Sequence, residues 1–245
     1  MAPSTAKKLK IVLILLGLAV LAAAGILIFK PTEQTVPAVS EAGSDETVRG
    51  FTFLDLHADS TLTDSVRNRL KDTLGSEAVE TKTVLDLEMH YPGFLERHFP
   101  ALHQLNKRLN YEGPRRVRIE HNTSKLIYRY STTFHYVELF FSNYTQKPLL
   151  FRIRAKRDGK DYLATLEKKY GTARETPWQN QKGKSFSWEI DKDILILSLF
   201  TDQYGQPQFE IMICHVGNIE DLLATEKKES GSSRMKKAGE GSRLF

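Results

Sequence analysis

One long apolar segment near the N-terminus constrains this chain more than any other feature. Residues 11–29, IVLILLGLAVLAAAGILIF, contain no polar side chain over nineteen positions. A helix rises about 1.5 Å per residue, so this segment spans roughly 28 Å, which is close to the roughly 30 Å hydrocarbon core of a bilayer. The segment therefore predicts a single transmembrane helix that anchors the chain.

A cleaved signal peptide is the alternative to an anchor. Its apolar core is usually about 7–15 residues long and ends at small residues where cleavage occurs. Here the small residues Ala22–Gly25 are followed by Ile26–Phe29, so the apolar run continues past the position at which a cleavage site is expected. The length and this continuation favour an uncleaved anchor.

The charges on either side of the apolar segment predict its orientation. Residues 1–30 hold four lysines and no acid, whereas residues 31–50 carry a net charge of −3. Positive residues stay on the cytoplasmic side of a membrane. We therefore expect residues 1–10 in the cytoplasm and everything after the helix outside it. In a bacterium this means the inner membrane, with the C-terminal domain in the periplasm.

Composition divides the rest of the chain into three parts. Residues 30–50 are rich in Pro, Ser, Thr, Glu and Ala without apolar periodicity, which is typical of a flexible stalk. Residues 51–229 contain regular apolar patterns and predict one folded extracytoplasmic domain. Residues 230–245 are poor in core-forming side chains and predict a disordered tail.

The net charge of the folded part argues against a nucleic-acid partner. The whole chain carries +5, but the two ends, residues 1–30 and 227–245, hold +8 and the stalk holds −3. Residues 51–226 therefore have no net charge. A domain that binds a duplex normally has a concentrated positive surface. We expect no nucleic-acid binding.

The apolar periodicity of the domain alternates between helical and extended patterns. A spacing of three and four residues predicts helices, and a spacing of two predicts strands. The predicted helices are 62–74, 94–110 and 160–170, with a short one at 219–228. The predicted strands of the first half are 81–89, 117–120, 125–130, 136–141 and 149–155.

An internal repeat at an offset of 59 residues indicates how these elements are organised. Residues 125–169 match residues 184–228 in one register, with Pro148 opposite Pro207 and Phe141 opposite Phe200. Two copies are too few for a solenoid. The sequence thus predicts an α+β fold: a duplicated βββα unit forming an antiparallel sheet, with the helices packed on one face.

This order of elements over about 125–228 resembles the small helix-plus-three-strand domains of bacterial envelope proteins, such as the BamE-like assembly lipoproteins. The resemblance implies a binding role rather than catalysis. The chain departs from that family in having no lipoprotein cysteine near its anchor. Its single cysteine, Cys214, lies in the apolar run 211–214 and is expected to be a buried structural thiol.

A basic stripe is the main candidate binding surface. Arg152, Arg154 and Lys156 alternate with apolar residues and so face one side of their strand. Arg129, on a neighbouring strand, extends the stripe. Such a surface suits an acidic partner, anionic headgroups or a cell-wall polymer. The structural alternative is a solvated sheet face balanced by acids such as Glu138.

A second candidate is the sequence Asp55-Leu-His57-Ala-Asp59. In an extended segment these three side chains point the same way and can converge on a divalent metal. The pattern is similar to the motif that opens the membrane dipeptidase family, which binds zinc in a β/α barrel, but this chain is too short for such a barrel. The alternative is a short strand whose Asp59 or Ser60 caps the next helix. A metal-dependent hydrolase is thus the competing functional hypothesis.

No other catalytic signature is present in the sequence. It contains no P-loop, no G-x-G-x-x-G, no nucleophile elbow, no H-E-x-x-H and no paired-cysteine zinc site. We therefore expect no cofactor. The leading hypothesis is a non-enzymatic, membrane-tethered domain that binds an envelope protein or a cell-wall component through its sheet face or an edge strand.

The orientation can be tested by protease protection. If the N-terminus is cytoplasmic, a protease added outside spheroplasts should degrade residues 51–245 and leave only a short fragment containing residues 11–29. Detection of an epitope at the C-terminus measures this. A C-terminal domain that survives while a known periplasmic protein is degraded would contradict the predicted orientation.

Overall fold

The structure is a computed structural model that describes residues 50–112, 115–116, 118–129, 131, 133–156, 159–178 and 183–241. The side chains of residues 112, 115–116, 159–160 and 231–241 are not described. Within the described residues no helix is long and apolar enough to cross a bilayer. The predicted cytoplasmic segment 1–10, the anchor 11–29 and the stalk 30–50, apart from Gly50, lie outside these residues.

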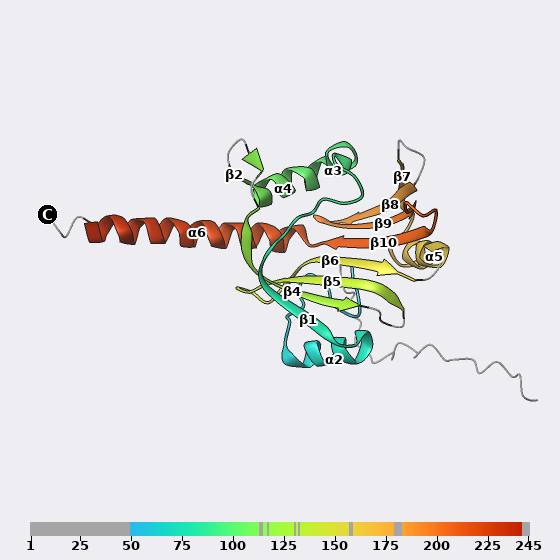
Figure 1. The fold of residues 1–245 in the computed structure, drawn as a ribbon, viewed down its shortest axis with the longest axis horizontal. Coiled ribbons are helices and arrows are strands. Elements are labelled where there is room, and N and C mark those ends of the chain that lie inside the picture. Colours follow the sequence, from blue (N-terminus) through green and yellow to red (C-terminus); the bar gives the residue numbers. More distant parts are fainter. Residues whose placement is uncertain are drawn as a thin grey trace, which may run out of the picture. The chain divides into compact units, whose positions relative to one another are not determined.

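An eight-stranded antiparallel sheet forms the centre of the domain, in the order β1-β4-β5-β6-β10-β9-β8-β7 (Figure 1). The α+β class with an antiparallel sheet is confirmed. The strands are β1 (Glu77–Val84), β4 (Glu120–Arg129), β5 (Phe134–Ser142), β6 (Pro148–Ala155), β7 (Arg174–Pro177), β8 (Gly183–Ile190), β9 (Asp193–Thr201) and β10 (Pro207–Cys214). A separate two-stranded ribbon joins β2 (Tyr111–Glu112) to β3 (Arg115–Arg116).

Five helices surround the sheet in the described part of the chain: α2 (Asp64–Leu74), α3 (Phe94–His98), α4 (Pro100–Asn110), α5 (Gly159–Tyr170) and α6 (Val216–Gly241). The sequence predicted one helix over 94–110, but the chain breaks at Phe99. Pro100 cannot donate the backbone hydrogen bond that would continue α3, so it starts α4 instead. Helix α6 runs past the predicted end at residue 228, and its backbone continues to Gly241 where the sequence predicted a disordered tail.

The helices cover both faces of the sheet, so the prediction of helices on one face is wrong. One core packs α3, α4 and α6 against side chains such as Leu150 and Met212; we call this side the α4 face. The other core packs α2, α5 and residues 51–56 against Phe151 and Ile213; this is the α2 face. Neighbours on one strand point to opposite faces, and β6, β9 and β10 are apolar on both. A sheet that is apolar on both faces must be covered on both.

The order of three strands and a helix occurs twice, as β4-β5-β6-α5 and β8-β9-β10-α6. Residues 59 apart nevertheless face opposite sides. Phe141 packs on the α2 face and Phe200 on the α4 face, and the same holds for Ile153 and Met212. The two following helices also lie on opposite faces. Duplication of a βββα unit stays a prediction.

The two edge strands are irregular or short. In β1 the pairing with β4 shifts register between Thr81 and Thr83, and Lys82 between them has φ of 53°. Two residues of β4, Asn122 and Thr123, lie opposite Lys82 alone, so this is a β-bulge whose extra residue is on β4 and which interrupts the regular pairing of the edge strand. At the other edge, β7 has only four residues and ends at Pro177, which has no backbone N–H.

A buried ion pair holds α6 against the sheet. His121 on β4 is 2% exposed, and its two ring nitrogens lie 2.7 Å from Glu226 Oε2 and 3.0 Å from the Leu109 carbonyl oxygen. Both neighbours are acceptors, so both ring nitrogens donate and the imidazole is charged. Glu226 also accepts from the backbone N–H of Asn122 at 2.8 Å. These bonds tie α6, α4 and β4 together.

We expect Glu226→Gln to lower the free energy of unfolding by about 3 kcal/mol, because it leaves a buried imidazolium without its counter-charge. Denaturant unfolding of the full-length protein measures this. Glu229→Gln is the matched control on the same helix. Glu229 accepts from Tyr144 at an exposed site, so its loss should cost less than about 1 kcal/mol.

The ion pair of His121 and Glu226 should also make the stability of the protein depend on pH. Burial lowers the pKa of His121, but Glu226 and the Leu109 carbonyl outweigh it and hold the pKa above its ordinary value. Burial raises the pKa of Glu226, but hydrogen bonds from His121 and Asn122 hold it below the usual range. The stability difference between wild type and Glu226→Gln should therefore shrink as the pH rises through the raised pKa of His121, and again as it falls through the lowered pKa of Glu226. A difference that is constant with pH would contradict a charged pair.

Candidate functional site

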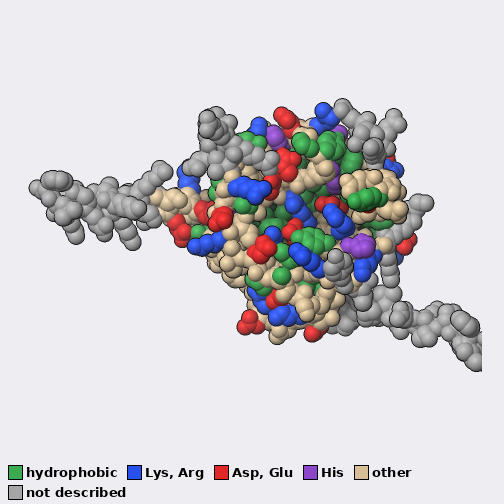
Figure 2. Space-filling view, viewed as in Figure 1, with side chains coloured by type: hydrophobic (Ala, Val, Ile, Leu, Met, Phe, Trp, Pro, Cys, Tyr) green, Lys and Arg blue, Asp and Glu red, His purple; other side chains and the backbone are tan. Residues whose placement is uncertain are grey.

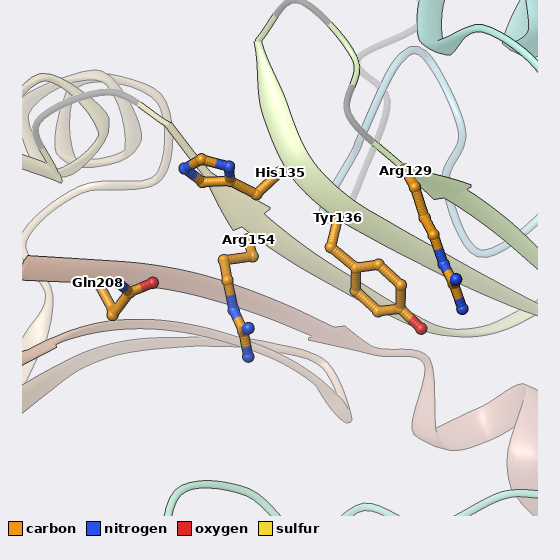
Figure 3. Close-up of a pocket in the computed structure, with 5 residues that line it drawn as sticks. All are labelled: Arg129, His135, Tyr136, Arg154 and Gln208. Carbon is orange, nitrogen blue, oxygen red and sulfur yellow. The ribbon is translucent and has the colours of Figure 1, made fainter. Parts of the chain in front are cut away.

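Two arginines flank a tyrosine on the α4 face of the sheet. Arg129 on β4 is the Cα partner of Tyr136 on β5, and Tyr136 is the Cα partner of Arg154 on β6. Neighbouring strands are about 4.8 Å apart, so the two arginine Cα atoms are separated by roughly 10 Å. Figure 3 shows both guanidinium groups extending in the same direction, one on each side of the tyrosine ring.

These residues line an open pocket of about 490 Å³ together with His135 and Gln208. In Figure 3 these two lie on the Arg154 side of Tyr136. Arg129 is exposed and pairs with no carboxylate within the part of the chain that the structure describes. Arg154 is 50% exposed. The pocket thus offers two solvent-accessible cations.

The tyrosine between the arginines is held in place by a carboxylate. The Tyr136 hydroxyl donates to Glu138 Oε1 at 2.6 Å, and Lys125 lies 3.7 Å from the same oxygen. Burial and the Glu138 contact raise the pKa of Tyr136, so the phenol stays protonated. Its ring is therefore a rigid, neutral wall between the two cations.

One acidic residue, Glu210, lies next to Arg154 at the pocket. Glu210 on β10 is the Cα partner of Arg154, and its Oε2 is 3.8 Å from the Arg154 guanidinium. Its side chain is only 16% exposed. Burial raises the pKa of Glu210, and the charges of Arg152 and Arg154 oppose this without reversing it. The pairing of Arg154 is long for a salt bridge, and its partner is a carboxylate that burial disfavours in its charged form.

The other two predicted basic residues lie elsewhere. Arg152 is on the same face as Arg154, but the segment between β1 and α3 crosses over it, and its guanidinium donates to the carbonyl oxygens of Asp86 and Glu88. Lys156 donates to the Ser131 carbonyl oxygen at 2.5 Å. Of the four residues predicted to form a basic stripe, only Arg129 and Arg154 share a pocket. Figure 2 accordingly shows basic and acidic side chains interspersed on the face in view.

The segment between β1 and α3 contributes a buried histidine, His90, that bonds to the sheet beneath it. His90 Nε2 is 2.8 Å from Ser198 Oγ, which is 2.9 Å from Ser185 Oγ, and Ser185 accepts from Trp178 Nε1 at 3.0 Å. Burial, followed by the charges of Arg152 and Arg154, lowers the pKa of His90 to about 3. The imidazole is therefore neutral at all ordinary pH values. The hydrogen bonds of this chain are all satisfied when Trp178 donates to Ser185, Ser185 donates to Ser198, and Ser198 donates to Nε2 of His90.

The Asp55, His57 and Asp59 side chains do not form the predicted row. Residues 54 and 55 both have positive φ, 48° and 64°, and Phe53 and Leu56 exchange backbone hydrogen bonds of 3.0 and 2.9 Å across them. This is a tight two-residue turn, so the expected extended segment is wrong. His57 Nδ1 accepts from the backbone N–H of Asp59 at 3.3 Å.

The carboxylate of Asp59 forms a salt bridge with Lys147 at 3.0 Å, so it does not contribute to the predicted row either. Among the described residues, no three side chains of His, Cys, Asp or Glu are grouped so that they could hold a metal ion. The predicted thiol at Cys214 is free and fully buried, as expected, and burial raises its pKa.

The different surroundings of Arg152 and Arg154 can be tested as a pair. Replacing Arg152 by Met should destabilise the fold by about 3 kcal/mol, because it removes a charged donor from two backbone carbonyls and a cation from beside the partly covered carboxylate of Glu210. Replacing the half-exposed Arg154 by Met should cost less than about 1 kcal/mol. Denaturant unfolding measures both, and equal losses would mean that the two side chains are equally covered.

Comparison with known proteins found no match: no family model, no curated protein and no solved structure is significantly similar to this chain.

Proposed function

We propose that this chain is a non-enzymatic, membrane-tethered binding protein. Residues 11–29 anchor it in the inner membrane, residues 30–50 form a stalk, and residues 51–229 capture an acidic segment of another envelope protein. The pocket formed by Arg129, Tyr136 and Arg154 is the capture site. A tether confines the pocket to the vicinity of the membrane, which raises its effective concentration toward partners held there.

The anchor part of the proposal rests on the nineteen uncharged apolar residues and on the lysines that precede them. The stalk part rests on the Pro-, Ser- and Thr-rich composition of residues 30–50 and its lack of apolar periodicity. Neither depends on the pocket, so the anchor and the capture site can be tested separately.

The observation that supports capture is the unpaired charge in the pocket. Arg129 is exposed without a carboxylate partner in the described residues, and Arg154 has only the distant contact to Glu210. Ionised guanidinium groups bind carboxylates through short, charge-assisted hydrogen bonds. Two of them, on side chains whose Cα atoms are about 10 Å apart across the sheet, can hold two carboxylates of one extended segment.

The chemistry of the pocket favours a protein partner. Arginine and tyrosine are among the side chains that most often dominate the free energy of protein–protein binding. Here the tyrosine ring is fixed between the two arginines, so little side-chain entropy is lost when a partner binds. An anionic cell-wall polymer is the alternative partner, and it would compete for the same two cations.

Capture can be tested with a fluorescent poly-glutamate peptide and the full-length protein in detergent. We expect Arg129→Gln and Arg154→Gln each to weaken binding about tenfold, the loss of roughly one charged hydrogen bond, and the double variant to weaken it further. Fluorescence anisotropy measures the dissociation constant. Raising the salt concentration should also weaken binding, because the pocket is open to solvent.

Arg174→Gln is the matched control. Arg174 is an exposed arginine of edge strand β7 that lies 3.9 Å from Glu189, outside the pocket, so its removal changes the net charge equally. If all three single variants lose the same affinity, binding depends on overall charge and the pocket is not the site. If the peptide does not bind but an anionic polysaccharide does, the protein-partner proposal is wrong.

A further inference from the structure

We propose that Glu210 regulates the pocket: its carboxylate restrains Arg154, and protonation of that carboxylate frees the arginine and strengthens the capture of carboxylate ligands. This inference rests on the function proposed above, and it adds to it a dependence of capture on the acidity of the compartment. The step is the addition of one proton from solvent to a Glu210 carboxylate oxygen.

The argument begins with the place of Glu210 in the sheet. It is the direct cross-strand neighbour of Arg154, on the same face, and its Oε2 is 3.8 Å from the guanidinium. Gln208, two residues away on β10, lines the pocket itself. A negative charge at Glu210 therefore lies next to the place where a ligand carboxylate would sit, and two like charges at such a site repel.

The groups around Glu210 decide how easily it takes up a proton. On β6 it faces the cations Arg152 and Arg154, which favour the carboxylate. On β5 the carboxylate of Glu138 disfavours it, and on β9 its Cα partner is the neutral Ser198. His90, from the segment above, reaches Ser198 but carries no charge, because its pKa is lowered to about 3.

Burial favours the protonated form of Glu210 over the carboxylate. The Glu210 side chain is 16% exposed, enough to exchange a proton with solvent but too little for good hydration of its charge. Burial accordingly raises the pKa of Glu210 above its ordinary value, despite both arginines. The carboxylate therefore gains its proton at a higher pH than a freely hydrated glutamate would.

Once Glu210 is neutral, its effect on Arg154 changes. The guanidinium is no longer attracted at 3.8 Å and can turn fully toward a ligand, and the repulsion between Glu210 and the ligand disappears. Arg152 cannot take the place of Arg154, because its guanidinium is bound to the carbonyls of Asp86 and Glu88. Protonation of Glu210 therefore increases the net positive charge at the pocket.

One other group of the pocket needs a control. His135 lines the same space, and histidine is itself a titratable side chain. The test therefore uses full-length protein that carries His135→Asn, with and without Glu210→Gln. The probe is a fluorescent peptide with cysteic acid in place of glutamate, because a sulfonate stays ionised throughout and any pH dependence then belongs to the protein.

We expect binding of this probe by the His135→Asn protein to tighten about tenfold as the pH falls from about 8 through the raised pKa of Glu210. Adding Glu210→Gln should give the tight binding already at about pH 8 and remove most of the pH dependence. Glu189→Gln is the matched control, because Glu189 has a similar 3.9 Å contact with an arginine outside the pocket. It should change neither value.

Two results would overturn the inference. One is pH-independent binding by the His135→Asn protein, which needs no change at position 210 and so is informative even if Glu210→Gln does not fold. The other is a folded Glu210→Gln protein, shown by its thermal melt, that binds the probe no better than its parent at about pH 8. If in either case Arg129→Gln and Arg154→Gln still weaken capture, the proposed function stands and only the regulation is wrong. If they have no effect, the capture site itself is wrong.

Discussion

The pairing of β6 with β10 is the interaction on which the rest of the domain depends. Six residue pairs, from Phe209 opposite Ala155 to Cys214 opposite Leu150, join two four-stranded halves into one sheet. Both cores cross this line, because Leu150 and Met212 contribute to one and Phe151 and Ile213 to the other. Neither half could bury its apolar residues without the other, so the sheet is a single cooperative unit.

The same pairing creates the electrostatics of the pocket. Arg154 belongs to one half of the sheet and Glu210 to the other, and they meet only because the two strands are in this register. A shift of one residue would turn every side chain of β10 to the opposite face, which would bury Glu210 in the α2-face core. The contact between Arg154 and Glu210 that we propose to regulate the pocket therefore depends directly on the register of β6 and β10.

Sequence patterns predicted what depends on near neighbours, and failed where distant segments meet. The alternation in 149–155 predicted β6 and the shared face of Arg152 and Arg154. Which of the two is covered depends on the segment 85–93, more than sixty residues earlier, and no local pattern indicates that crossing. The burial of both faces, by contrast, does have a sign in the sequence, because β6, β9 and β10 are apolar at consecutive positions. The break at Pro100 was also visible, as a proline inside a predicted helix.

The β-bulge opposite Lys82 and the short strand ending at Pro177 have a consequence for crowding. Sheets with long regular edges tend to join side by side when copies of a domain are concentrated. An edge interrupted by a bulge and an edge of four residues that ends in proline both offer little regular backbone for such pairing. Copies of this domain can therefore reach a high local concentration without polymerising through their sheets.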